Sequence, residues 1–453
     1  MKMKKQILIL AAATLSVAIA GCNKYLEEKP DKKLVVPSTL ADMQSILDAY
    51  SPNSFVDPGE GEVSSDDYYL TDAALAALSQ EGHRRLYTWQ KGNVFEARSN
   101  SWYYGYTSTY SANAVLAGLP AIPRNAGNQV EWDNLKGQAL LLRGKNLLQM
   151  AFLWTPAYDE ASAGSDLGLP LRVNTDFNEP SARASNSETY QQIVSDLRSA
   201  APLLPVTPLH PIRASRPAAY GLLARAYLSM RKYTDAGLYA DSCLQLQSKL
   251  IDYNTLSATA AYPLVQFNDE TILFSVIATP APINPSRARV VPELYNLYAA
   301  NDLRKTVFFR QNTDGSYAFK GNYTGQLAPF GGVATDEMIL IRAEAAARKG
   351  QTADAMADLN RLLKTRLRNN TFTELTATSA AQALSLVLLE RRKELLNRGL
   401  RWMDLKRLNK EGANITLRRT VGTQTYTLPP NDGRYALAIP EDVIALTGIP
   451  QNP

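Results

Sequence analysis

The chain has 453 residues, 45% of them hydrophobic and 20% charged, and a formal net charge of +5. This composition supports a large folded core and lacks the basic excess that is typical of nucleic-acid binding. The only histidines are His83 and His210 and the only cysteines are Cys22 and Cys243, which argues against a histidine-based zinc site, a cysteine–histidine nucleophile and a disulfide framework. We therefore expect no cofactor, no metal and no nucleic-acid partner.

The first 22 residues have the pattern of a bacterial lipoprotein signal. Three lysines precede an almost wholly apolar run from Ile7 to Ala20, which is too short to span a bilayer comfortably. The run continues into Gly21-Cys22, and this ending is similar to a lipobox, in which the cysteine is acylated and the preceding peptide is removed. We predict a signal peptide over 1–21 and a lipid on Cys22, so that the lipid alone holds the protein on the membrane. The alternative is an ordinary cleaved signal with an incidental cysteine.

The remaining chain is expected to form a leash followed by one domain. Without residues 1–21 the formal charge falls to +2, because that segment carries three lysines and no acid. Residues 22–37 are expected to be the lipid anchor and an extended leash, and residues 38–453 a single domain. Within that domain we expect an N-terminal part over about 38–250 and a C-terminal part over about 251–453.

Helical periodicity dominates the domain. The first helix is expected to begin at Ser38 or Thr39, with Asp42 in its first turn, where the helix dipole favours an acid. Further helices are predicted over about 97–119, 131–154 and 187–204, the last two as a pair. Strands are expected to be few and short, over 271–276 and in a hairpin of 306–310 with 316–320 around Asp314-Gly315.

Two segments, 216–246 and 335–368, follow the tetratricopeptide pattern. In each, an alanine of the first helix lies twelve residues before an alanine of the second, at 224 and 236 and again at 343 and 355. Small residues at these positions allow two antiparallel helices to approach closely. Each pair leaves an apolar face that only a neighbouring pair can cover, so the pairs should stack. The predicted fold class is therefore mainly α, a scaffold of helix pairs with long loop-rich insertions.

Catalytic motifs are absent. The sequence has no Gly-x-Ser-x-Gly elbow, no His-Glu-x-x-His and no glycine-rich phosphate loop. Asp66 and Asp67 are adjacent carboxylates, and adjacent carboxylates cannot flank one glycosidic bond at the separation that hydrolysis needs. We predict that the protein has no catalytic residues and is not an enzyme. A surface glycoside hydrolase is the alternative, and new reducing ends on incubation with polysaccharides would support it.

Several segments share a pattern with one known family. The two most specific are the helix Leu340–Ala345, "L-x-R-A-E-A", and the segment Glu390–Arg407, "ERR-x-EL … G-x-R-x-x-DLKR". Weaker matches are Tyr25-Leu26-Glu27 followed by Pro30, Leu135–Arg143 with Gly168–Leu171, Asn301–Arg304, Ile439-Pro440 and Gln451-Asn452-Pro453. These segments resemble the SusD/RagB family of Bacteroidetes outer-membrane lipoproteins over nearly the whole chain. We interpret Glu390, Arg401 and Asp404 in this signature as stabilising the fold.

The resemblance implies a SusD-like fold and a cell-surface function. It implies a lipoprotein, anchored in the outer membrane, that binds an oligosaccharide and delivers it to a SusC-like TonB-dependent transporter. The helix pairs would face the transporter and the loops would face the ligand. Two alternatives stay open: a peptide-binding member of the same family, and a lipid-anchored tetratricopeptide adaptor with no small ligand.

Candidate ligand-binding residues are aromatic side chains with polar neighbours in predicted loops, because ring faces stack on sugars while amides and carboxylates bind hydroxyls. The Trp89–Asn93 segment also loosely resembles the aromatic-plus-asparagine arc of starch-binding family members. The candidates thus form two clusters, Asp66–Tyr69 and Tyr87–Asn93, and a third, weaker patch that includes Tyr323. In contrast, the aromatic string Trp102, Tyr103, Tyr104, Tyr106 and Tyr110 has mixed helical spacing and is expected in the core. The candidates are Asp66, Asp67, Tyr68, Tyr69, Tyr87, Trp89, Asn93 and Tyr323.

Overall fold

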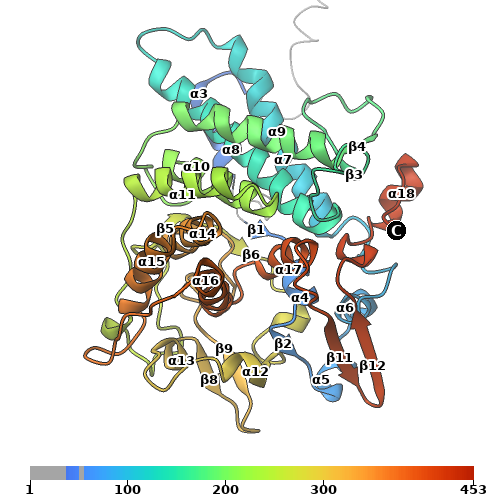
Figure 1. Cartoon of the computed structure of the whole chain (residues 1–453). Helices are drawn as coiled ribbons and strands as arrows, with labels where there is room; N and C mark the ends of the chain where they lie inside the picture. The colour runs from blue at the N-terminus through green and yellow to red at the C-terminus, as the bar shows by residue number, and fades with distance from the viewer. Residues whose placement is uncertain (1–36, 50–55) are drawn as a thin grey trace, which may run out of the picture.

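A computed structural model describes residues 37–49 and 56–453 (Figure 1). The predicted signal peptide, Cys22 and the leash up to residue 36 lie outside these residues. Within the described ranges no helix has both the length and the apolar character needed to cross a bilayer.

The N-terminal part is a layer of long helices, in blue to green in Figure 1. α8, the longest, packs between α7 and α9, and α3 lies against α7 and α8. The prediction of these helices is confirmed to within a few residues. Thr39 and Asp42 form the expected start of α3, because each side chain accepts a hydrogen bond from the other residue's backbone N–H. The bounds are α3 Leu40–Asp48, α7 Ser101–Gly118, α8 Gln129–Trp154 and α9 Asn186–Ala200.

The two predicted tetratricopeptide pairs are present and stack on one another. The first pair is α10 (Arg216–Ser229) with α11 (Tyr233–Leu246), and the second is α14 (Thr335–Arg348) with α15 (Thr352–Lys364). The four spaced alanines are completely buried, as close helix approach requires. α11 also packs against α14, so the face left open by one pair is covered by the next. α16 (Ala380–Glu394) extends this stack against α14 and α15.

Over residues 37–49 and 56–453 the strands form six separate two-stranded sheets rather than one large sheet. The predicted hairpin is confirmed as β8 with β9, with Gly315 at φ +82° in the turn. Its first strand begins later than predicted, because Arg304–Val307 form a short helix. A second hairpin, β11 with β12, is not among the strands predicted from the sequence. Strand bounds are β1 Val56–Asp57, β2 Tyr68–Tyr69, β3 Leu167–Pro170, β4 Arg183–Ser185, β5 Thr271–Leu273, β6 Val276–Ile277, β7 Arg289–Val290, β8 Phe309–Gln311, β9 Tyr317–Phe319, β10 Val333–Ala334, β11 Leu417–Val421 and β12 Gln424–Leu428.

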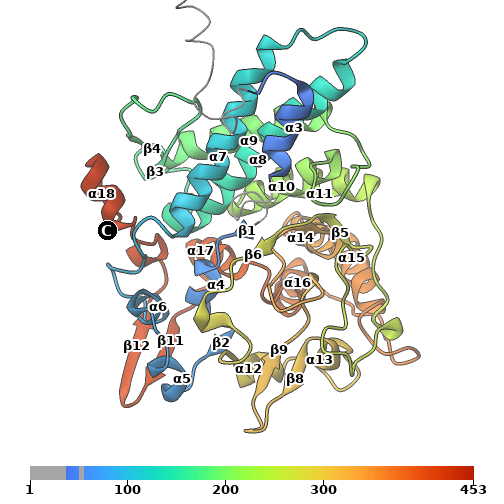
Figure 2. The ribbon, with the colours of Figure 1, turned by 180° about the vertical axis from the view of Figure 1, so that it is seen from behind.

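Short helices connect these elements. Their bounds are α4 Glu60–Ser64, α5 Asp72–Ala76, α6 Glu81–Tyr87, α12 Pro292–Tyr295, α13 Arg304–Val307, α17 Arg401–Lys410 and α18 Glu441–Thr447, with 3-10 turns at Leu119–Ala121, Ala201–Leu203, Tyr253–Thr255, Ala281–Ile283 and Gly433–Tyr435. Figure 2 shows from behind that α4 lies beside α17 and that the β8–β9 hairpin occupies the end of the molecule farthest from α3.

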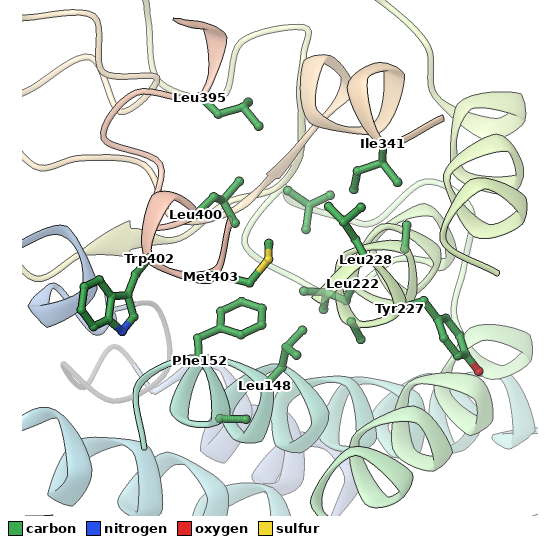
Figure 3. Close-up of a cluster of buried hydrophobic side chains, with 14 of the residues drawn as sticks. Leu148, Phe152, Leu222, Tyr227, Leu228, Ile341, Leu395, Leu400, Trp402 and Met403 are labelled. Atoms are coloured by element: carbon green, nitrogen blue, oxygen red, sulfur yellow. The ribbon is translucent and has the colours of Figure 1, made fainter. Parts of the chain in front are cut away.

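One apolar core joins the N-terminal and C-terminal parts (Figure 3). Phe152 of α8, Leu228 of α10 and Met403 of α17 meet in it, although they are far apart in the chain. Trp402 is 2% exposed and Leu405 is fully buried, so the apolar side chains of the Glu390–Arg407 segment pack inward. Burial of this much apolar surface is the main stabilising contribution to the fold.

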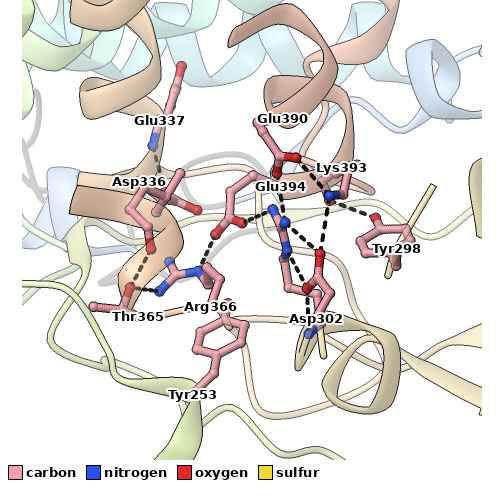
Figure 4. A network of polar contacts seen from close by, with 12 residues as sticks. Tyr253, Tyr298, Asp302, Asp336, Glu337, Thr365, Arg366, Glu390, Lys393 and Glu394 are labelled. Atoms are coloured by element: carbon pink, nitrogen blue, oxygen red, sulfur yellow. Dashed lines mark hydrogen bonds and ion pairs between the residues drawn. The ribbon is translucent and has the colours of Figure 1, made fainter. Parts of the chain in front are cut away.

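The signature also builds a buried ionic network beneath the helices (Figure 4). The Arg304 guanidinium donates to Glu390 at 2.7 Å and to Glu394 at 2.8 Å, and all three side chains are buried. Arg366 joins Glu394 to Glu270 in the same way, at 2.7 and 2.8 Å. Each guanidinium bridges two carboxylates from different segments and so fixes their relative positions, and removing one partner would leave a buried charge unpaired. The structural interpretation of Glu390 is confirmed.

Candidate functional site

The predicted carboxylates Asp66 and Asp67 pair with arginines from the family signature. Asp66 accepts from the Arg401 guanidinium at 2.7 and 2.8 Å, and Asp67 pairs with Arg392 at 2.9 Å. Burial opposes ionisation of Asp66, but Arg401 and Arg392 outweigh it and hold the pKa of Asp66 below its ordinary value. These contacts give both acids a role in joining the N-terminal and C-terminal parts, as was expected for Arg401.

Three predicted stacking residues surround an arginine of this chain. The Arg419 guanidinium carbon lies 3.9 Å from the ring centroid of Tyr87, 4.7 Å from that of Trp89 and 5.1 Å from that of Tyr68. The Trp89 indole N–H donates to the Ser64 carbonyl at 2.9 Å, and the indole is only 4% exposed. Because stacking on a ligand needs an exposed ring face, we place the candidate site elsewhere, and a ligand contact by these rings stays a prediction.

The other candidates are scattered. Tyr69 is half-buried at a cavity of about 250 Å³ that Asp66, Tyr68 and Trp89 also line. Asn93 is exposed, and its backbone N–H donates to the Glu441 carboxylate. Tyr323 is buried away from these residues, in a separate cluster of apolar side chains, and its hydroxyl donates to Glu270 at 2.7 Å. The structure therefore brings together part of the predicted set and separates Tyr323 from it.

A cavity of about 610 Å³ forms an aromatic groove between α7, the loop 171–182 and α18. In Figure 1 this region lies at the right of the molecule, where α18 approaches the β3–β4 connection. Most of the lining surface is apolar, and polar side chains are spaced along it. We define the aromatic groove by Tyr103, Tyr106, Tyr110, Asn113, Arg172, Asn174, Phe177, Asp442, Val443 and Leu446.

α7 exposes one side of the aromatic string and buries the other. The expectation that the string lies in the core is right for Trp102, which is 5% exposed and packs edge-on against Trp154 at 5.1 Å. It is wrong for Tyr103 and Tyr110, which are 50% and 38% exposed and line the groove. The signal in the sequence is their spacing of seven residues, which places both on the same side of a helix.

The floor of the groove is fixed by Tyr106. Its hydroxyl donates to the Pro170 carbonyl at 2.7 Å, and its ring lies 5.1 Å from that of Trp102. Burial raises the pKa of Tyr106 far above its ordinary value, so the hydroxyl stays protonated. Tyr106 is therefore a rigid part of the wall, and its polar end is already occupied.

The loop opposite α7 is held by a buried polar chain. The Asn113 side-chain amide donates to the carbonyls of Arg172 and Asn174 at 2.9 and 3.1 Å. Its oxygen accepts from Arg143 at 2.9 Å, and Arg143 pairs with buried Asp196 at 2.7 Å. This network positions the loop at its start, because backbone carbonyls held by buried donors cannot move freely.

Two strongly exposed apolar side chains rise from the groove walls. Phe177 is 77% exposed and its ring lies 4.9 Å from that of Tyr110 at an angle of 32°, while Leu446 of α18 is 78% exposed. Exposed aromatic rings beside an apolar cavity mark a binding surface. Arg98 and Arg172 balance Asp176 and Asp442 around it, so the groove has no strong net charge. Among the described residues no three His, Cys, Asp or Glu side chains are grouped to hold a metal ion.

Comparisons with known proteins agree on one family. A SusD-like family model described as "Starch-binding associating with outer membrane" matches residues 24–228, and the model of the SusD family matches residues 335–438. No protein in the curated set of sequences shows a significant match to the chain.

Solved structures share the fold over almost the whole chain. A SusD superfamily protein from Bacteroides thetaiotaomicron aligns with a TM-score of 0.73 and 21% identity, over 92% of this chain and 100% of that one. A SusD-like carbohydrate binding protein from Bacteroides vulgatus aligns with a TM-score of 0.66 and 22% identity, over 90% and 96% of the two chains. A laminarin binding SusD-like protein gives a TM-score of 0.64 and 18% identity, over 91% and 97%. With the family models, which together match about two thirds of the chain, these findings show that the protein belongs to the SusD family.

Proposed function

We propose that the protein captures a glycan in the aromatic groove, without chemically changing it, and delivers it to a TonB-dependent transporter. The observation that carries the proposal is the pair of exposed tyrosines, Tyr103 and Tyr110, on the wall of a 610 Å³ cavity. Ring faces stack on the apolar faces of sugars, and Asn174 and Asp442 offer polar groups at the edge. The balanced charge around the groove favours a neutral ligand.

The family relationship supports the cellular setting of this proposal. One family model is described as associating with the outer membrane, and one structural neighbour is named as laminarin binding. We propose that residues 1–21 are a lipoprotein signal peptide and that Cys22 carries the lipid that holds the protein on the outer cell surface. We further propose that residues 38–453 act as one ligand-binding domain presented to a SusC-like partner.

A binding screen tests the ligand class. The soluble chain starting at Asn23 is screened by calorimetry against glycan and peptide panels, and each hit is repeated with Tyr110→Ala. We expect a glycan to bind and Tyr110→Ala to weaken it at unchanged melting temperature. Tyr262→Ala is the matched control, because Tyr262 is 39% exposed and lies outside the groove. A peptide bound in the groove, or new reducing ends released from a glycan, would contradict the proposal.

A separate experiment tests the anchor. Cells expressing the full chain are labelled with radioactive palmitate, with Cys22→Ala as the control. We expect label on the wild-type protein alone and recovery of that protein in the outer-membrane fraction. Unlabelled wild-type protein in the soluble fraction would refute the anchor without affecting the proposed ligand.

A further inference from the structure

The two exposed tyrosines of the groove stand at a fixed separation along a straight element. Tyr103 and Tyr110 are seven residues apart in the uninterrupted helix α7, which corresponds to about 10.5 Å along its axis. Both rings line the groove. Tyr106, one turn from each of them, has its hydroxyl bonded to Pro170 and forms the floor between them. The groove therefore offers two ring-stacking positions in line, separated by the Tyr106 floor.

This spacing matches one class of glycan conformation. In an extended β-1,4-linked hexose chain each ring is turned over relative to the previous one, so every second ring presents the same face in the same direction. The two-ring repeat of such a chain is close to the axial spacing of Tyr103 and Tyr110. Coiled chains, such as α-1,4- and β-1,3-linked glucans, do not place alternate rings along a straight line.

Building on the proposed glycan-binding function, we infer that the groove selects flat, extended β-1,4-linked glycans. Rings n and n+2 of the ligand stack on Tyr103 and Tyr110, and ring n+1 passes over the Tyr106 floor. Phe177, 4.9 Å from Tyr110, enlarges the apolar surface at that end of the groove. Both tyrosines belong to α7, which is packed against α8 through the contact of Trp102 with Trp154. The separation of the two stacking positions therefore does not adapt to a curved ligand.

The geometry sets a minimum ligand length. A disaccharide reaches only one of the two tyrosines, whereas a trisaccharide is the shortest chain that reaches both. Affinity should therefore rise roughly tenfold from a β-1,4-linked disaccharide to the trisaccharide, as one additional aromatic contact contributes. Further rings should add less, unless they reach Phe177.

The test is a calorimetric comparison of tetrasaccharides that differ in linkage. Cellotetraose and mannotetraose represent extended β-1,4 chains, and maltotetraose and laminaritetraose represent coiled ones. Each is titrated into the wild type, Tyr103→Ala, Tyr110→Ala and the control Tyr262→Ala, with cellobiose and cellotriose added for length. We expect at least one β-1,4 tetrasaccharide to bind at least tenfold more tightly than both coiled ones. Each groove variant should lose the gain in affinity from cellobiose to cellotriose, and the control should keep that gain.

The outcomes separate this inference from the function on which it rests. If a coiled tetrasaccharide binds more tightly and Tyr110→Ala weakens it, the groove is a glycan site but the linkage inference is wrong. If a β-1,4 chain binds both groove variants as tightly as it binds the wild type, the assignment of the two stacking positions is wrong. If none of these tetrasaccharides binds the wild type, the linkage inference fails, and the broader glycan and peptide screen with Tyr110→Ala decides the proposed function independently.

Discussion

The guanidinium carbon of Arg419 lies 3.9 Å from the ring centroid of Tyr87, inside a cage that Tyr68 and Trp89 complete. Its N–H groups donate to the carbonyls of Val63 and Ser65, and also to that of Tyr87. The Arg419 guanidinium of the β11–β12 hairpin thus lies against the aromatic rings that the sequence analysis predicted to stack on a sugar.

Arg419→Met should destabilise the protein strongly. The substitution leaves the carbonyls of Ser65 and Tyr87 without a donor, while that of Val63 keeps the Tyr68 hydroxyl, and it removes the cation from the cage. We expect a loss of about 3 kcal/mol in the free energy of unfolding. Urea denaturation measures it. Arg418→Met is the matched control, because Arg418 is the neighbouring residue of the same strand and is exposed. Equal stability of the two variants would contradict the structural role of Arg419.

Trp89→Ala should lower the melting temperature rather than act on ligand binding alone. The indole is 4% exposed and holds the Ser64 carbonyl, so its removal leaves a cavity and an unpaired acceptor, at a cost of about 3–5 kcal/mol. Thermal unfolding is compared with exposed Gln90→Ala. A variant that melts like the wild type but loses glycan affinity would restore the sequence-based assignment of Trp89 to the ligand site.

Local signals in the sequence predicted the helix pairs and the β8–β9 hairpin. The alanines at 224 and 236 are twelve residues apart, so the evidence for their helix pair lies within one short window. Arg419 follows Tyr87 by 332 residues, and no periodicity can report a contact over that distance. Tyr103 and Tyr110 were expected in the core with the rest of the aromatic string. Their spacing places both on one side of α7, but whether that side is covered depends on the loop 171–182 and α18.

Asp66→Asn should destabilise the protein at neutral pH and much less in acid. Because Arg401 and Arg392 hold the pKa of Asp66 below its ordinary value of 3.8, the ionised side chain stabilises the fold above that pH and loses its contribution as the pH falls through the folded-state pKa. We expect a difference of about 3 kcal/mol at pH 7 that shrinks below pH 3.8. Urea denaturation of both proteins at pH values from 7 to below 3.8 measures this difference in the free energy of unfolding. The exposed pair Lys249–Asp269 supplies the control, Asp269→Asn, which should have little effect at any pH.

The stability of the wild type should rise with pH in mildly alkaline solution, and Lys406→Met should remove most of this rise. The Lys406 ammonium is buried against the carbonyls of Phe152 and Thr155, and burial lowers the pKa of Lys406 from 10.5 to about 7. The unfolded chain therefore binds more protons than the folded one between these values, so wild-type stability should rise there by up to about 1.4 kcal/mol per pH unit.

Urea denaturation between pH 7 and pH 10 checks the Lys406 prediction. The difference between the wild type and Lys406→Met isolates the contribution of this group, because every other titratable group is common to both proteins. Exposed Lys349→Met is the control and should follow the wild-type slope. An unchanged slope in Lys406→Met would show that another group causes the rise.

Asn113→Ala should loosen the wall of the aromatic groove. Without its amide, the carbonyls of Arg172 and Asn174 lose their buried donor, which costs about 1–3 kcal/mol, while Arg143 keeps Asp196 as its partner. We expect faster cleavage in the loop 171–182 under limited proteolysis and weaker glycan binding. Asn125→Ala, in an exposed turn, is the control. Unchanged cleavage of the loop would contradict the assigned role of Asn113.

The position of Arg419 in the chain bears on the order of folding. The cage residues are synthesised early, yet the cation that fills their cage comes more than three hundred residues later. Contacts so distant in sequence make folding slow, because a long segment must be closed before the contact stabilises anything. The early part of a growing chain therefore cannot complete this region until almost the whole chain has been synthesised.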